Sequence, residues 1–145
     1  STILNTGQVD PGLKQLVAYV ASNAAGCRYC QAHTSHNAVK RGISPEKMGK
    51  AFEFDQSDLF SVAERAALRV ALHGGTVPNG VEAVHMETLK AHFSEREVVE
   101  IVGVISLFGF LNRWNDTMAT RLEPTAASFA SAALSASGWQ IGKHT

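Results

Sequence analysis

Net charge is lacking in this sequence, because 13 Lys and Arg residues balance 13 Asp and Glu residues over 145 positions. Charged residues make up only 18% of the chain, below the usual share of about 25%. A nucleic-acid-binding protein should carry a basic patch, and a protein of anionic membrane surfaces should carry basic clusters, so neither class is expected. A surface poor in charge favours association between copies, and we therefore predict a homo-oligomer.

Long apolar runs are lacking too. The longest covers residues 101–111, well short of the roughly 20 residues that a membrane-spanning helix needs, so a core helix is expected there. No basic segment followed by an apolar stretch opens the sequence, and with no signal peptide visible we expect a cytoplasmic protein. No repeat, linker or low-complexity segment divides the 145 residues, which predicts one domain over residues 1–145.

Strand patterns are the third absence. Val, Ile and Thr do not alternate with polar residues over the length of a strand, whereas apolar residues recur at helical spacing. We predict an all-α fold of about six or seven helices around one core. Capping and breaking residues place these helices at residues 11–25, 27–41, 44–52, 61–74, 81–93 and 95–122, with a final one up to Gly138.

Cysteine is scarce, and the two that occur, Cys27 and Cys30, are separated by two residues. Two cysteines are too few for a disulfide scaffold, so the spacing indicates redox or metal chemistry in a reducing compartment. Both lie at the start of a predicted helix, where free amides and the macrodipole stabilise a thiolate. At this spacing the pair can cycle between dithiol and disulfide.

His33 follows Cys30 by three residues, which places the two side chains about 60° apart on a helix. An imidazole in that position can remove the thiol proton or hold the thiolate as an ion pair. Cys30, Cys27 and His33 are therefore the candidate catalytic residues.

Other interpretations of these residues remain open. The cysteines can be small buried hydrophobes, or they can join His33 and His36 as ligands of a zinc ion. Structural zinc sites usually take ligands from two separate elements, and this set lies on one short helix, so no metal is predicted. Haem attachment requires a histidine directly after the second cysteine, and Gln31 occupies that position. No cofactor is predicted.

The segment Gly26–Thr34 resembles the cysteine motif of the carboxymuconolactone decarboxylase superfamily, in particular its branch of AhpD-like alkylhydroperoxidases. The flanking sequence agrees, since Ser44–Glu46, Phe60–Leu68 and residues 93–116 are similar to the later helices of such proteins. The resemblance covers roughly residues 10–123.

The resemblance implies an AhpD-like helical fold that assembles as trimers or hexamers. It also implies a thiol-dependent peroxidase that reduces hydroperoxides without metal or haem and is regenerated by an external dithiol or a lipoyl-type protein. By motif position, Cys30 attacks the peroxide, Cys27 resolves the product, and His33 serves as base or proton relay.

Two departures from the family pattern affect the proton relay. The family histidine commonly stands four residues after the second cysteine, whereas His33 stands three after it. An acidic relay residue about twelve positions before the first cysteine is replaced by Gln15, so the relay is shorter, uses Glu64, or is absent. The alternative functions are a decarboxylase-type lyase, which should not need a redox dithiol, and a non-catalytic thiol sensor or interaction protein.

Other noticeable side chains have ordinary explanations. Phe108, Phe110 and Trp114 recur at helical spacing and are expected in the core, with an apolar peroxide pocket as the alternative. Val84 is expected to point inward from its helix. His144 lies in a terminal segment that is expected to be mobile, and it is given no role in the site.

Overall fold

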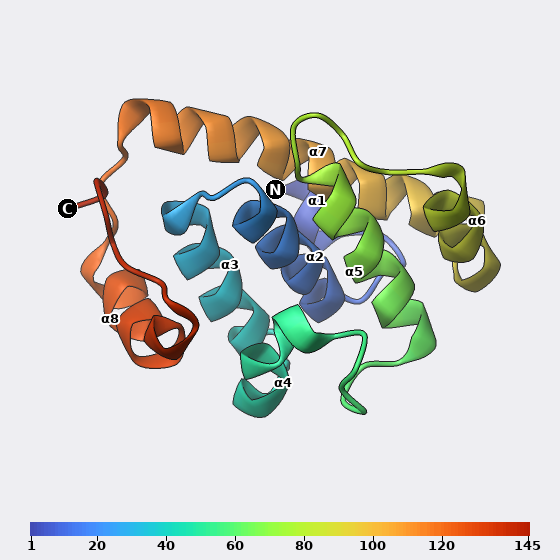
Figure 1. Ribbon diagram of the computed structural model, residues 1–145, viewed down its shortest axis with the longest axis horizontal. Coiled ribbons are helices and arrows are strands. Elements are labelled where there is room, and N and C mark those ends of the chain that lie inside the picture. The colour runs from blue at the N-terminus through green and yellow to red at the C-terminus, as the bar shows by residue number, and fades with distance from the viewer.

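Helix α2 (Pro11–Ala24) lies at the centre of the molecule, with α3, α5 and α7 packed around it (Figure 1). The structure is a computed structural model that describes residues 1–145, and it contains helices and no strands. The predicted all-α class is confirmed. The other elements are α1 (Thr2–Asn5), α3 (Arg28–Lys40), α4 (Pro45–Gly49), η1 (Ala51–Glu53), α5 (Val62–Gly74), α6 (Ala83–His92), α7 (Glu95–Met118), α8 (Pro124–Ala133) and η2 (Ser135–Ser137).

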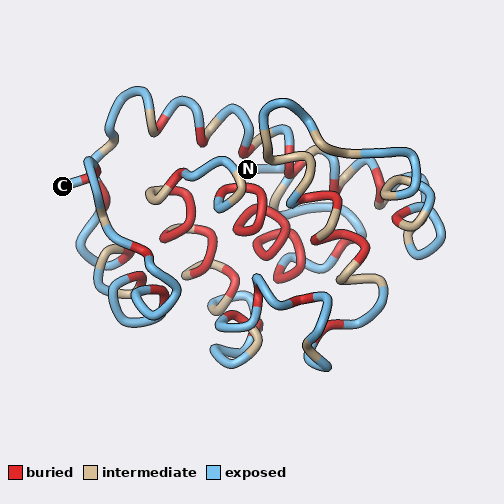
Figure 2. The backbone as a smooth tube through the Cα atoms, in the orientation of Figure 1, coloured by how far each residue is buried: buried red, intermediate tan, exposed pale blue.

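The central helix starts where the sequence predicts. Asp10 is the N-cap, its carboxylate accepts a hydrogen bond from the Leu13 amide, and Pro11 opens the first turn. Residues 12–22 are all buried, and they form the continuous red stretch of Figure 2. Because neighbours cover α2 on all sides, its polar residues Lys14 and Gln15 are buried with the apolar ones.

The two predicted capping boxes are confirmed. Ser61 and Glu64 exchange hydrogen bonds at the start of α5, and Ser94 and Glu97 do so at the start of α7. The fifth predicted helix, α6, is present, but the inward orientation of Val84 is wrong, since that side chain is largely exposed. Only Leu89 of α6 is buried, because the helix packs against α5 and α7 along one narrow face.

The predicted ends of the C-terminal helices are wrong. Helix α7 ends at Met118 rather than near Leu122, because Ala119 adopts a left-handed conformation with φ of 49°. The final helix stops at Ala133 and is followed by the short η2 instead of continuing to Gly138. The expected helix over 44–52 is divided into α4 and η1. The four-residue helix α1 carries no capping signal that would predict it.

The last residues of the chain form a docked C-terminal tail, residues 138–145, and the prediction that this segment is mobile is wrong. The Trp139 indole donates to the Arg28 carbonyl at 3.0 Å, and the Arg28 guanidinium donates to the Gln140 carbonyl at 3.1 Å. The Leu122 amide donates to the His144 carbonyl at 2.8 Å, and His144 is only 1% exposed. The tail therefore joins the end of α7 to the start of α3.

The aromatic residues of α7 divide between core and surface. Phe108 is buried as expected, whereas Phe110 and Trp114 are 61% and 56% exposed and stack on each other with ring centroids 6.1 Å apart. The expectation that these two lie in the core is wrong, because α7 covers α2 with one face and turns its other face outward. No helix has the length and apolar character needed to cross a membrane.

Gly75, directly after α5, marks a close approach to α2. A Cβ at this position would lie 2.6 Å from the Ala21 carbonyl oxygen and 2.9 Å from its Cα, and neither backbone atom can move easily. We expect Gly75→Ala to lower the free energy of unfolding by about 1–3 kcal/mol in a urea titration. Gly49→Ala is the matched control, because open space surrounds that position. Equal stability of the two variants would contradict the close approach.

Candidate active site

The two cysteines meet at the start of α3. Helix α2 ends before Gly26, whose φ of 77° reverses the chain, and the Cys27 amide donates to the Ser22 carbonyl at 3.0 Å. Cys27 is then the N-cap of α3, and its Sγ accepts a hydrogen bond from the Cys30 amide at 3.3 Å. Both thiols are free, and the predicted helix start brings them together.

The pKa values of the two cysteine thiols are shifted in opposite directions. The hydrogen bond from the Cys30 thiol lowers the pKa of Cys27 against the opposing effect of burial, and the Cys30 amide lowers it further. The same hydrogen bond raises the pKa of Cys30 above its usual range, together with burial and the negative charge on Cys27. Cys27 is therefore the more acidic of the two thiols.

Helix α7 supplies the surroundings of the sulfurs. The Asn115 amide nitrogen donates to Cys30 Sγ at 3.7 Å and lowers the pKa of Cys30, an effect smaller than that of the Cys27 hydrogen bond. The Asp116 carboxylate raises the pKa of Cys27, an effect smaller than the fall due to the Cys30 hydrogen bond. Both cysteines are buried.

His33 points away from the sulfur pair toward the segment after α7. Its Nε2 lies 2.6 Å from Glu123 Oε2, and its ring packs against Tyr29 with centroids 4.7 Å apart. The Tyr29 hydroxyl donates to the other Glu123 oxygen at 3.2 Å, and burial followed by the Glu123 charge raises the pKa of Tyr29 to about 12. The role of His33 as base for Cys30 stays a prediction.

Glu64, the predicted alternative for the acidic relay, and Gln15, which replaces the family's acidic residue, make no hydrogen bond to a histidine. Glu64 uses one carboxylate oxygen on Lys47 Nζ at 2.6 Å and the other on the Ser61 amide at 2.8 Å. Gln15 is buried in α2, and its side-chain oxygen has no hydrogen-bond partner. The acids that do pair with histidines are Glu123, with His33, and Asp116.

The partner of Asp116 is His144 of the C-terminal tail, which the sequence analysis missed. His144 Nε2 lies 3.1 Å from Asp116 Oδ1, and its Nδ1 lies 2.8 Å from the Thr120 carbonyl oxygen. The imidazole also packs against Tyr29, with centroids 5.7 Å apart. No local pattern signals this pair, because 28 positions separate its members and only the return of the tail joins them.

The zinc alternative does not match the geometry. His36 stacks on Phe129 with ring centroids 4.6 Å apart, and His33 is bound to Glu123, so the two imidazoles are not gathered with the sulfurs. No cluster of three or more Cys, His, Asp or Glu residues is arranged to hold a metal ion.

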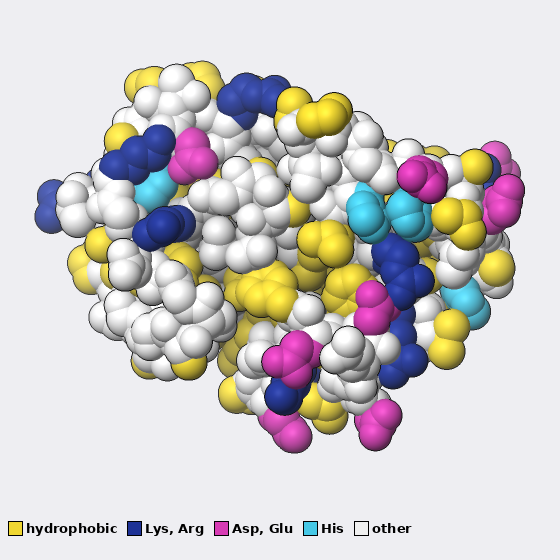
Figure 3. Space-filling model, viewed as in Figure 1, with side chains coloured by type: hydrophobic (Ala, Val, Ile, Leu, Met, Phe, Trp, Pro, Cys, Tyr) yellow, Lys and Arg dark blue, Asp and Glu magenta, His cyan; other side chains and the backbone are white.

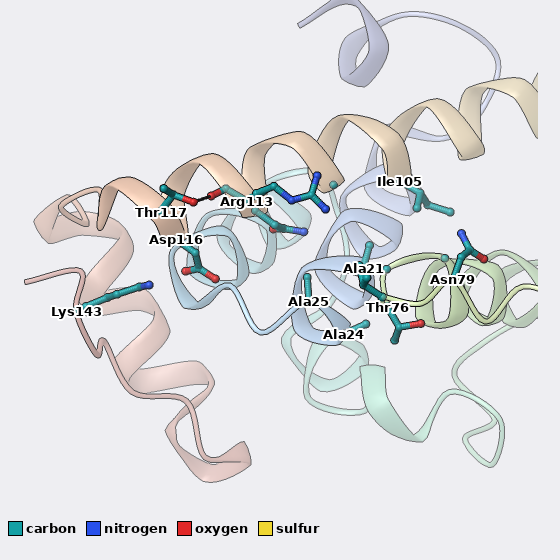
Figure 4. Close-up of a pocket in the computed structure, with 15 residues that line it drawn as sticks. Ala21, Ala24, Ala25, Thr76, Asn79, Ile105, Arg113, Asp116, Thr117 and Lys143 are labelled. Carbon is teal, nitrogen blue, oxygen red and sulfur yellow. Dashed lines mark hydrogen bonds between the residues drawn. The ribbon is translucent and has the colours of Figure 1, made fainter.

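A cavity of about 800 Å³ has Asp116 in its wall (Figure 4). Small residues from the end of α2, from α5 and from α7 form much of its wall, and Arg113 and Lys143 bring positive charge to it. Figure 3 shows basic, acidic and histidine side chains gathered on the surface near the end of α7. Asp116 lines this cavity from the turn of α7 that carries Asn115, the residue that donates to Cys30 Sγ.

Comparison with known proteins agrees with the motif. The profile of the carboxymuconolactone decarboxylase family matches residues 2–73, which include α2, the cysteine pair and most of α5. The chain is 30% identical over 110 residues to the uncharacterized protein YnjA of Escherichia coli K12, across 76% of this chain and 60% of that protein. It is 26% identical over 110 residues to the uncharacterized protein YdfG of Bacillus subtilis 168, across 74% of each.

Solved structures resemble the whole fold. The debrominase Bmp8 superposes with a TM-score of 0.83 at 36% identity over 89% of this chain and 69% of the debrominase. A cysteine-to-alanine variant of Bmp8 in complex with 2,3,4-tribromopyrrole gives 0.84 at 35% identity, over 90% and 70% of the two chains. An Agrobacterium tumefaciens protein of unknown function, with a suggested role as the antioxidant defence protein AhpD, gives 0.73 at 20% identity over 84% of each chain, which supports the fold alone.

Proposed function

This chain belongs to the carboxymuconolactone decarboxylase family, and we propose that it is a thiol-dependent peroxidase that reduces hydroperoxides with the Cys27–Cys30 pair. The observation that supports this proposal most strongly is the meeting of two free cysteines at the start of α3, where the Cys30 amide donates to Cys27 Sγ at 3.3 Å. A thiolate is the nucleophilic form of cysteine, and a second thiol within hydrogen-bonding reach is placed to complete a disulfide.

The reaction balances with the groups at the site. The Cys30 thiolate attacks the distal peroxide oxygen, the O–O bond breaks, and an alkoxide leaves. Cys30 is then a sulfenic acid, and Cys27 displaces its hydroxyl group to form the S–S bond. That hydroxyl leaves as water with the Cys27 proton, and an external dithiol or a lipoyl-type protein reduces the disulfide.

The likeness to Bmp8 supports reductive dehalogenation as a second candidate. There the thiolate would attack a halogen of an electron-rich aromatic ring instead of a peroxide oxygen, leaving a sulfenyl halide and an aryl carbanion. The carbanion takes up a proton, and the second cysteine displaces the halide to give the same disulfide. Both reactions oxidise one dithiol to a disulfide by two electrons, so the same cysteine pair can carry out either reaction.

The cavity beside Asp116 is the proposed binding place of the substrate. Its volume of about 800 Å³ falls in the range of roughly 300–1,000 Å³ that is typical of small-molecule sites. Arg113 and Lys143 on its wall favour a substrate that carries negative charge or a polar group. The cavity adjoins the cysteine pair through α7, because Asp116 lines it and the neighbouring Asn115 donates to Cys30 Sγ at 3.7 Å.

Free-thiol titration tests the proposal. After one equivalent of tert-butyl hydroperoxide, the wild-type protein is expected to lose both free thiols and to form one equivalent of tert-butanol. The variant in which serine replaces both cysteines controls for loss of peroxide by other routes.

A parallel titration with 2,3,4-tribromopyrrole separates the two candidates. Thiol loss with the halopyrrole and none with the peroxide would replace the peroxidase by the dehalogenase. Thiols that both reagents leave unchanged would overturn both and favour the lyase or sensor alternatives.

A further inference from the structure

The proposed reaction requires a proton donor for the leaving group, and the Asp116–His144 pair is a candidate for it. In the proposed peroxidase reaction, the attacking Cys30 is a thiolate and the Cys27 proton leaves with the water of the second step, so the alkoxide of the first step needs a proton from elsewhere. An alkoxide is a poor leaving group without one, and a positioned acid typically accelerates such a step by about 10²–10⁴-fold.

Hydrogen-bond chemistry assigns a proton to this pair. The Thr120 carbonyl can only accept, so the His144 Nδ1 that lies 2.8 Å from it carries a hydrogen. The opposite nitrogen, Nε2, lies 3.1 Å from an Asp116 oxygen, and two bare acceptors would repel each other at that distance. One further proton therefore belongs between His144 and Asp116.

The position of the Asp116–His144 pair is also suitable for a proton donor. Asp116 lines the cavity, and its neighbour Asn115 donates to Cys30 Sγ at 3.7 Å, so the Asp116 carboxyl group lies on the turn of α7 next to the attacking sulfur. His144 is 1% exposed and reaches Asp116 only because the tail is docked. The other ionisable groups around the imidazole are Tyr29, which packs against it from α3, and the neighbouring Lys143.

We propose that Asp116, held and supplied by His144, is the general acid that protonates the leaving group when the cysteine pair reduces its substrate. The proton passes from the pair to the alkoxide as the O–O bond breaks, giving the alcohol, and water restores it afterwards. Asp116 is the residue that meets the reacting atoms, and His144 is a positioning residue. The inference rests on the proposed dithiol reaction and applies equally to the aryl carbanion of the dehalogenase.

The test compares two oxidants that differ in their need for an acid. The tert-butoxide that leaves tert-butyl hydroperoxide must be protonated, whereas the acetate that leaves peracetic acid is stable as an anion. Rate constants for thiol loss are measured in single-turnover mixing for the wild type, Asp116→Asn, Asp116→Glu and His144→Gln. His92→Gln is the matched control, because His92 is exposed at the end of α6.

Asp116→Asn is expected to slow the hydroperoxide reaction by about 100-fold and the peracid reaction by less than about 3-fold. We expect about a 10-fold loss for His144→Gln with the hydroperoxide alone, partial recovery in Asp116→Glu, and no change in His92→Gln.

The possible failures are distinguishable. Equal slowing of both oxidants would show a structural role, and unchanged rates would show no role, so either result overturns the assignment while the peroxidase stands. A wild-type protein that keeps its thiols with tert-butyl hydroperoxide overturns the proposed function and this inference with it. Because Asp116 is partly exposed, Asp116→Asn is expected to fold normally, and the assignment does not depend on the buried His144 variant alone.

Discussion

Serine at position 30 is expected to lower turnover of tert-butyl hydroperoxide by about 10³-fold or more, because the attacking sulfur is lost. Cys27 should stay reduced in this variant. In Cys27→Ser the attack is retained but the resolving thiol is missing, so a sulfenic acid should accumulate on Cys30. Dimedone labelling and mass spectrometry of both variants locate that sulfenic acid.

The opposite pKa shifts of Cys27 and Cys30 make this experiment decisive about which sulfur attacks and which resolves. The resemblance assigns the attack to Cys30, whereas the hydrogen bond between the two thiols lowers the pKa of Cys27. Since the hydrogen bond to Cys27 and its charge raise the pKa of Cys30, their removal in Cys27→Ser should move alkylation of Cys30 to lower pH. A sulfenic acid on Cys27 of the Cys30→Ser variant, with none on Cys30 of Cys27→Ser, would exchange the two roles.

The second large effect is expected for stability, at a buried lysine of α2. Lys14 is 1% exposed, and its ammonium donates to the Ile3 and Thr6 carbonyls at 2.7 and 2.6 Å. It also lies 3.5 Å from Glu100 of α7. Lys14→Met would leave both carbonyls and the carboxylate without this partner. We expect a loss of about 3–5 kcal/mol in the free energy of unfolding, measured with urea.

The exposed Lys90 of α6 provides the matched control, and Lys90→Met should change stability by less than about 0.5 kcal/mol. The pH dependence gives a second readout. Burial opposes ionisation of Glu100, but the Val9 and Gln8 amides and Lys14 outweigh it and lower the pKa of Glu100. Its stabilisation is therefore complete above the unfolded pKa and is lost as pH falls through the folded value. Equal stability of Lys14→Met and Lys90→Met would contradict this interpretation.

Local signals predicted most of the helices. Asp10 with Pro11, and the capping boxes at Ser61 and Ser94, act within one turn, so they can be recognised without knowledge of the fold. The end of α7 could not be predicted in this way, because a left-handed alanine at position 119 has no sequence signature and depends on the chain that follows it.

The candidate site was predictable to the same extent. The spacing of Cys27 and Cys30 indicates a redox pair because both residues lie on one turn, and the structure brings them together there. His144 could not be recognised, since its contact with Asp116 exists only after the tail has folded back. The predicted homo-oligomer stays a prediction, and the exposed Phe110 and Trp114 are side chains that an interface on α7 would cover.

The hydrogen bond from the Cys30 amide to Cys27 Sγ has a thermodynamic consequence for recycling. When Cys27 is ionised, its sulfur is a far better acceptor than a sulfur in a disulfide, so the start of α3 stabilises the reduced pair more than the oxidised form. Preferential stabilisation of the dithiol raises the reduction potential of the couple. A weakly reducing electron donor can then regenerate the protein, and oxidation of the pair is correspondingly easy to reverse.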